Sequence, residues 1–167
     1  MADHDAIREL AEALVTEFAA LGKTVATAES CTGGWVAKAI TDIPGSSAVF
    51  GYGVVSYANG AKESLLGVKS QTLEAHGSVS SEVVEEMAKG TLRLSGADIA
   101  VAISGVAGPT GGTDQKPVGY VWFGWAKREG NNVRVDSSSE QFSGDRELVR
   151  EASVAHALQG VRERIQS

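Results

Sequence analysis

The residues best suited to chemistry lie in one short polar segment, Glu29-Ser30-Cys31-Thr32-Gly33-Gly34. The segment follows a β-branched run and precedes a helical pattern. A serine at such a junction can act as a nucleophile, and the N–H groups of residues 32–34 can stabilise an oxyanion. Alternatively, Ser30 or Thr32 only caps the helix. Cys31 is a second candidate nucleophile, although cysteines are commonly buried packing residues.

A serine nucleophile needs a base, and the sequence offers histidine or lysine. His4, His76 and His156 are scattered and adjoin no second catalytic-looking cluster, so a Ser-His-Asp triad has little support. Lys62 follows Tyr57-Ala58-Asn59 and is expected in the first turn of a helix. The helix dipole disfavours a cation there and lowers its pKa, which suits a Ser-Lys pair. The alternative is an ordinary solvated lysine.

Two further segments can bind an anionic or amide-bearing ligand. Residues 105–113 contain four glycines without a Walker or dinucleotide pattern, so they form either a ligand-enclosing loop or a flexible surface loop. Arg146, in Ser143-Gly144-Asp145-Arg146, can grip a phosphate or carboxylate, or can pair with Asp145 at the surface. One cysteine and three dispersed histidines give no metal-ligand spacing, so we expect no metal site.

Composition excludes several classes of protein. The 167 residues include 20 glycines without a Gly-X-Y period, and 43% are apolar, which argues against collagen and disorder. A net charge of −6 argues against a large nucleic-acid interface. The single cysteine forms no internal disulfide, no apolar run could span a membrane, and the acidic N-terminus does not resemble a signal peptide. We therefore expect one cytoplasmic domain over residues 1–167.

The hydrophobic pattern predicts the elements that position these residues. It indicates an α/β fold, a three-layer α/β/α sandwich with a mixed sheet. The loops after strands 24–28 and 98–103 are expected to meet at the carboxyl end of the sheet. Asn59 is expected to cap the helix that carries Lys62. Helices are predicted at 5–21, 35–40, 59–66, from 81 onward and at 145–165, and strands at 24–28, 48–57, 98–103, 118–127 and 133–142, the last two as a hairpin.

Taken together, the motifs resemble one known family, the CinA C-terminal domain family. The resemblance covers about residues 7–159. It rests on 28–34 (Ala-Glu-Ser-Cys-Thr-Gly-Gly), 57–62 (Tyr-Ala-Asn-Gly-Ala-Lys), 103–112 (Ile-Ser-Gly-Val-Ala-Gly-Pro-Thr-Gly-Gly), 116–119 (Lys-Pro-Val-Gly) and 144–146 (Gly-Asp-Arg), in this order.

The resemblance implies hydrolysis of the carboxamide of nicotinamide mononucleotide to nicotinic acid mononucleotide and ammonia, without a metal or organic cofactor. It implies that Ser30 is the nucleophile and Lys62 its base, with Tyr57 orienting groups beside them. Ser47 is the rival nucleophile or a supporting residue. The implied substrate-binding residues are Thr32, Gly33, Gly34, Ser47, Asn59, Ser104, Gly105, Ala107, Gly108, Thr113 and Arg146.

Other functions stay open at this point. A catalytically silent domain that binds a nucleotide or docks a partner would share these motifs, and a thiol enzyme would use Cys31. The expected partner is a small mononucleotide, with neither nucleic acid nor membrane. Exposed hairpin edges predict a homodimer or higher homo-oligomer.

Overall fold

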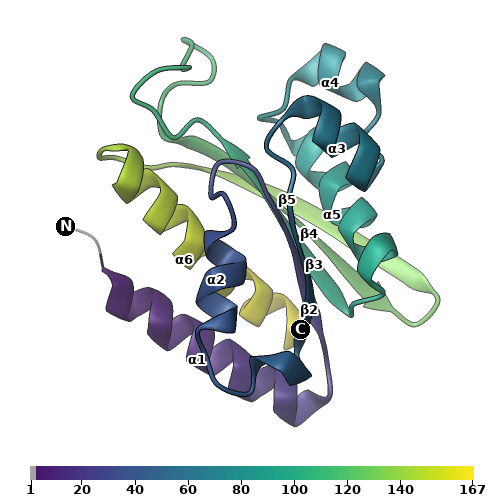
Figure 1. The fold of residues 1–167 in the computed structure, drawn as a ribbon. Coiled ribbons are helices and arrows are strands. Elements are labelled where there is room, and N and C mark those ends of the chain that lie inside the picture. Colours follow the sequence, from purple (N-terminus) through teal and green to yellow (C-terminus); the bar gives the residue numbers. More distant parts are fainter. Residues whose placement is uncertain (1–2) are drawn as a thin grey trace.

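A computed structural model describes residues 3–167, in which helices cover both faces of one β-sheet (Figure 1). Helices α1, α2 and α6 lie on one face, and α5 lies on the other with α3 and α4 packed against it. This arrangement confirms the predicted three-layer α/β/α sandwich. The helices are α1 (His4–Leu21), α2 (Trp35–Thr41), α3 (Asn59–Leu66), α4 (Ser70–His76), α5 (Ser81–Ser95) and α6 (Arg146–Ile165), and a 3₁₀ turn, η1, spans Ser46–Ala48.

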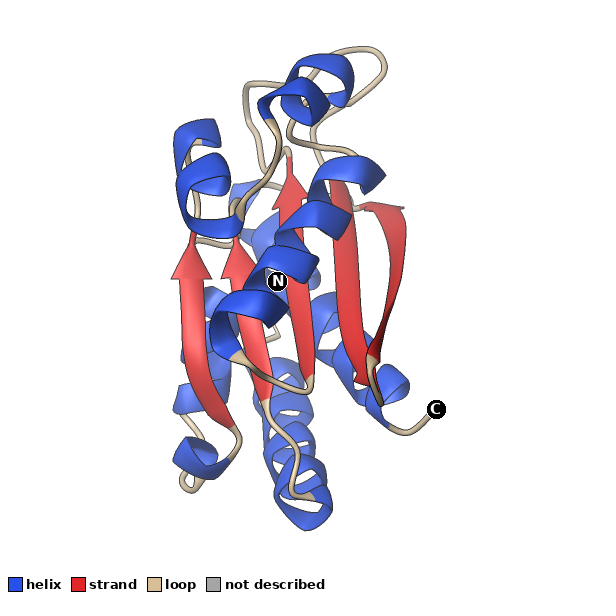
Figure 2. Ribbon diagram, turned by 90° about the vertical axis from the view of Figure 1, so that its right-hand side faces the viewer, coloured by secondary structure: helices blue, strands red, loops and turns tan. Residues whose placement is uncertain are grey.

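The sheet is mixed, with the strand order β2-β1-β3-β4-β5 (Figure 2). Strand β1 is parallel to β2 and β3, whereas β4 is antiparallel to β3 and β5. Helices cover the central strands β1 and β3 on both faces, which explains their nearly continuous burial. The strands are β1 (Val25–Glu29), β2 (Phe50–Val55), β3 (Ile99–Gly105), β4 (Tyr120–Glu129) and β5 (Asn132–Gln141).

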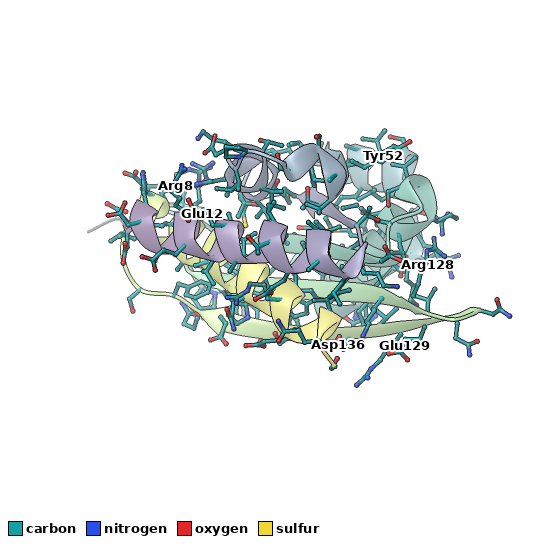
Figure 3. The ribbon with its side chains drawn as sticks, turned by 90° about the horizontal axis from the view of Figure 1, so that it is seen from below. Arg8, Glu12, Tyr52, Arg128, Glu129 and Asp136 are labelled. Carbon is teal, nitrogen blue, oxygen red and sulfur yellow. The ribbon has the colours of Figure 1, made fainter. Side chains whose placement is uncertain are left out.

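Helix α1 shows how the amphipathic pattern becomes packing. Its apolar residues recur at helical spacing and are buried on the side that packs against α6 and α2, whereas Arg8 and Glu12 form an ion pair of 3.0 Å on its exposed side (Figure 3). The helix ends at Gly22, whose φ of 64° lies in the left-handed region. The buried residues are Ile7, Ala11, Leu14, Val15 and Phe18.

The contact between α5 and α3 fixes the helix that carries Lys62. Ser80 caps α5 by accepting a hydrogen bond from the N–H of Val83. Further along, a Cβ built on Gly90 would lie only 1.9 Å from the carbonyl oxygen of Leu66. Only glycine therefore lets the end of α3 approach α5 this closely.

The structure corrects two local predictions. Helix α4 lies in a stretch for which we predicted no helix, and His76 is its last residue. Ala58, not Asn59, is the N-cap of α3, and Asn59 is the first helical residue. The hairpin is confirmed, with Gly130 and Asn131 between β4 and β5. None of the helices in residues 3–167 combines the length and apolar character that a membrane crossing requires.

Candidate active site

Ser30 directly follows β1, at the point where this strand ends beside β3. Its N–H group donates a hydrogen bond of 3.0 Å to the carbonyl oxygen of Ile103, the partner of Glu29 in the parallel pair. The backbone of Ser30 is therefore anchored to the central strands β1 and β3 of the sheet. Ser30 is only 9% exposed. The predicted meeting of the two loops at this edge is confirmed.

Lys62 reaches Ser30 from α3, the helix that follows β2. Its Nζ lies 3.0 Å from Ser30 Oγ, and it donates hydrogen bonds to the carbonyl oxygens of Ser56 (2.8 Å) and Tyr57 (3.1 Å). Only 1% of the lysine is exposed. The predicted first-turn position on α3 is confirmed, and the alternative of a solvated lysine is wrong.

Burial affects the protonation of Lys62 and Cys31 in opposite ways. Loss of solvation lowers the pKa of the Lys62 amine, because the charged form is the one that loses water. No carboxylate among the described residues forms an ion pair with Lys62. Burial raises the pKa of the Cys31 thiol to about 12, since there the charged form is the thiolate. At neutral pH, Cys31 is thus a protonated and poorly nucleophilic thiol.

The turn after Ser30 leaves only part of its backbone free. The N–H of Gly33 donates to the carbonyl oxygen of Ser30 at 3.0 Å, so Gly33 is not available as the oxyanion donor we expected. The N–H groups of Cys31 and Thr32 have no acceptor among residues 3–167. Gly33 and Gly34 have φ values of 60° and 100°. Glycine adopts these positive values readily, which allows the tight turn.

Glu29 is a buried carboxylate directly before Ser30 that our sequence analysis did not single out. Its oxygens accept hydrogen bonds from the N–H groups of Val36 (2.8 Å) and Ala37 (3.1 Å), at the start of α2. Burial raises the pKa of this carboxyl, and the N–H donors of α2 oppose that rise. Glu29 therefore fastens the turn to α2 and forms no ion pair with Lys62. Its position before a helix start was the signal that could have revealed this role.

Arg146 connects two of the predicted segments. It is the first residue of α6 and donates hydrogen bonds to the carbonyl oxygen of Gly108 (2.7 Å) and to the Tyr57 hydroxyl (3.3 Å). Asp145 instead caps α6 by accepting from the N–H of Leu148, so the alternative of a simple Asp145–Arg146 pair is wrong. Arg146 is exposed and has no carboxylate partner in the described part of the chain.

The predicted binding residues in and after β3 pack against neighbouring elements or bond within their own loop. Ser104 is 1% exposed at the end of β3, and Ala107 packs into the core with α6 and α2. A Cβ on Gly105 would lie 2.6 Å from Val121, so this glycine permits close packing against β4. Thr113 is exposed and closes its own turn with Lys116.

Two predicted residues stand apart from the Ser30–Lys62 pair. Ser47 lies in η1, before β2, and β2 begins beside Val25 at the start of β1. Because β1 and β2 are parallel, Ser47 is at the opposite end of the sheet from Ser30 and is not a rival nucleophile within this chain. Asn59 is exposed at the first position of α3.

A second missed residue is Arg150, one turn after Arg146. Its guanidinium donates to the carbonyl oxygens of Cys31 (3.0 Å) and Thr32 (3.1 Å). The spacing of Arg146 and Arg150 on one helix was a signal that both face the same neighbour.

Comparisons with known proteins show which family the chain resembles. The family profile "CinA C-terminal domain" matches residues 7–165. A protein of Escherichia coli K12 named nicotinamide-nucleotide amidohydrolase PncC is 53% identical over 153 residues, which cover 92% of this chain and 91% of that protein. A crystal structure of a competence/damage inducible protein from Agrobacterium tumefaciens is 44% identical, with a TM-score of 0.89 over 95% of this chain and 94% of that one.

A second crystal structure, of competence damage-inducible protein A from Klebsiella pneumoniae, is 39% identical with a TM-score of 0.90 over 96% of this chain and 97% of that one. Profile, sequence and fold agree over nearly the full length of each partner. The matched region includes the paired Ser30 and Lys62, and the chain belongs to the CinA C-terminal domain family.

Proposed function

We propose that this protein hydrolyses the carboxamide of nicotinamide mononucleotide through a Ser-Lys mechanism. One observation carries the proposal: the buried Lys62 Nζ lies 3.0 Å from Ser30 Oγ, within reach of its proton. Two of its neighbours, the carbonyl oxygens of Ser56 and Tyr57, can only accept hydrogen bonds, and the third is the Ser30 hydroxyl. A neutral amine has two N–H donors for the carbonyls and one lone pair for the serine proton. The name of the E. coli relative supports the choice of substrate.

The geometry supports the following first half-reaction. Ser30 Oγ attacks the carboxamide carbon while Lys62 Nζ takes the hydroxyl proton. The carbonyl oxygen becomes an oxyanion, for which the unpaired N–H groups of Cys31 and Thr32 are the available donors. The Lys62 ammonium then gives its proton to the amide nitrogen, the C–N bond breaks, and ammonia leaves. The product is an ester between the substrate acyl group and Ser30.

The second half-reaction returns the enzyme to its starting state. Lys62 is neutral again and takes a proton from a water molecule, which attacks the ester carbon. The bond to Ser30 Oγ breaks, the serine recovers a proton from Lys62, and nicotinic acid mononucleotide leaves. One lysine thus serves as base and acid in turn, as a single histidine does in other hydrolases.

Arg146 is the best candidate for the substrate phosphate. Two of its N–H groups are used by Gly108 and Tyr57, which hold the guanidinium in place, and others remain for a ligand. A fixed guanidinium without a carboxylate partner suits bidentate binding of phosphate. The Gly105–Thr113 loop then encloses the substrate beside it.

Ammonia release from purified protein tests this function. We expect turnover of nicotinamide mononucleotide and at least about 100-fold lower kcat/KM for nicotinamide riboside, because the riboside loses the charge-assisted contacts of its phosphate. Free nicotinamide should also be a poor substrate. Binding of the mononucleotide without release of ammonia would contradict the proposal and favour a silent binding domain.

A further inference from the structure

The guanidinium of Arg150 binds the backbone that directly follows Ser30. Its Nε donates to the carbonyl oxygen of Cys31 at 3.0 Å, and its Nη2 donates to that of Thr32 at 3.1 Å. The guanidinium also lies over the ring of Trp35, 5.5 Å from its centre. No carboxylate among residues 3–167 forms an ion pair with it. Arg150 thus binds two consecutive backbone carbonyl groups with one guanidinium.

Holding these carbonyls also fixes the N–H groups of the same peptides. In a trans peptide the C=O and N–H bonds point in opposite directions. Since the Cys31 carbonyl points to Arg150, the Thr32 N–H points away from it. The next peptide obeys the same rule: the Thr32 carbonyl faces Arg150, and the Gly33 N–H reaches back to the carbonyl oxygen of Ser30.

The Thr32 N–H, like that of Cys31 and unlike that of Gly33, has no acceptor among the described residues. The Gly33 N–H is bonded within the turn. Thr32 itself is fully buried. An unpaired N–H in a buried turn beside a nucleophile is costly unless a ligand uses it. This is the property of a preformed oxyanion donor.

We infer that Arg150 is a positioning residue, which orients the Thr32 N–H toward the oxyanion by fixing the Cys31 and Thr32 carbonyls. The inference rests on the proposed amidase function and adds a residue to it. Arg150 contacts neither Ser30 Oγ nor Lys62 Nζ. Its effect therefore passes through the peptide planes of the turn and not through the reacting groups.

The first experiment compares Arg150→Met with the control Arg162→Met. Arg162 lies on the same helix but pairs with Glu17, away from the turn. We expect Arg150→Met to lower kcat about 10- to 100-fold with KM changed little, because a misplaced donor affects the transition state more than the bound substrate. Arg150→Lys, which keeps the charge but not the fork, should recover only part of this loss. Arg162→Met should keep wild-type kcat.

A thioamide substrate separates positioning from general damage. Sulfur is larger than oxygen and accepts hydrogen bonds more weakly, so an aligned oxyanion donor favours the amide over the thioamide. We expect the wild-type preference for nicotinamide mononucleotide over its thioamide analogue to fall about 10-fold in Arg150→Met. The pH at which kcat/KM rises should stay unchanged, since Lys62 is untouched.

The outcomes separate the two proposals. An inactive wild-type protein would refute the amidase function itself. An active wild type whose Arg150→Met variant keeps its kcat would refute only the role of Arg150. A variant that loses activity but keeps the full preference for the amide would show a merely structural role, and would also overturn the inference.

Discussion

At the scale of single residues, the site depends on the burial of one amine beside one hydroxyl. The motif Glu29–Gly34 and the position of Lys62 made Ser30 and Lys62 candidates, and the family resemblance implied that they act as a pair. The spacing of 32 residues in sequence could not show that Nζ lies 3.0 Å from Ser30 Oγ. Nor could it show that the carbonyl oxygens of Ser56 and Tyr57 hold the amine there, because main-chain atoms carry no residue-specific signal.

The lowered pKa of Lys62 gives the first prediction at this scale. The neutral amine is the active base, so kcat/KM should rise with pH as Lys62 loses its proton. Because burial lowers the pKa of Lys62, this rise should be centred below the ordinary lysine value of about 10.4. A pH–rate profile measures it. Lys62→Met should lose at least about 10³-fold in kcat, and a variant that keeps the same profile would refute lysine as the base.

Cys31 gives a second prediction at this scale. Its thiol has a pKa of about 12 and is buried, so it should react slowly with iodoacetamide at neutral pH. Cys31→Ala should keep kcat within about threefold of wild type, at a cost in stability of roughly 1 kcal/mol for the lost packing. Rapid inactivation by the reagent, prevented by substrate, would instead indicate a thiol enzyme.

At the scale of elements, the site depends on the close packing of α3 against α5, which Gly90 allows. Hydrophobic periodicity predicted α1, α5 and the buried strand β3, because each has a strong apolar pattern. It missed α4, which buries none of its residues and so carries no such pattern. The sequence showed Gly90 in α5 only as a glycine within a helix, and its contact with Leu66 appears only in the fold.

Gly90 gives the prediction that belongs to this scale. In Gly90→Ala the new Cβ would lie 1.9 Å from the carbonyl oxygen of Leu66, so α3 must move and carry Lys62 with it. We expect a loss of about 1–3 kcal/mol in the free energy of unfolding, together with a lower kcat. Urea unfolding and ammonia release measure the two effects.

Gly60→Ala is the matched control for that variant. Gly60 lies in α3, and a Cβ there would meet nothing within 4 Å. Its stability should be unchanged or slightly higher, because alanine favours the helix over glycine. A Gly90→Ala protein as stable and active as Gly60→Ala would contradict the proposed dependence on close packing.

At the scale of the whole molecule, four distant segments build the site around one sheet edge. They are residues 29–34, 56–62, 103–108 and 146–150. The layer architecture and the meeting of the loops after β1 and β3 were predictable from the pattern of buried strands. The strand order was not, because periodicity does not say which strands are neighbours. The same gap explains the wrong expectation for Ser47, whose place follows from the parallel register of β1 and β2.

A site assembled from the whole fold should couple ligand binding to global stability. We expect nicotinamide mononucleotide to raise the melting temperature of the inactive Ser30→Ala variant. At 100 times its Kd the ligand should add about 2.7 kcal/mol to the free energy of unfolding. Differential scanning calorimetry measures this shift, and nicotinamide riboside at the same concentration should give a smaller one. An equal shift with Arg146→Ala would contradict its role in holding the phosphate.

The most direct test of the account compares the three hydroxyl and thiol candidates as nucleophiles. Single-turnover ammonia release from nicotinamide mononucleotide should fall at least about 10³-fold in Ser30→Ala. It should stay within about threefold of wild type in Cys31→Ala and Ser47→Ala, because neither side chain is activated and Ser47 lies at the far end of the sheet. A Ser30→Ala protein that releases ammonia at the wild-type rate would contradict the account.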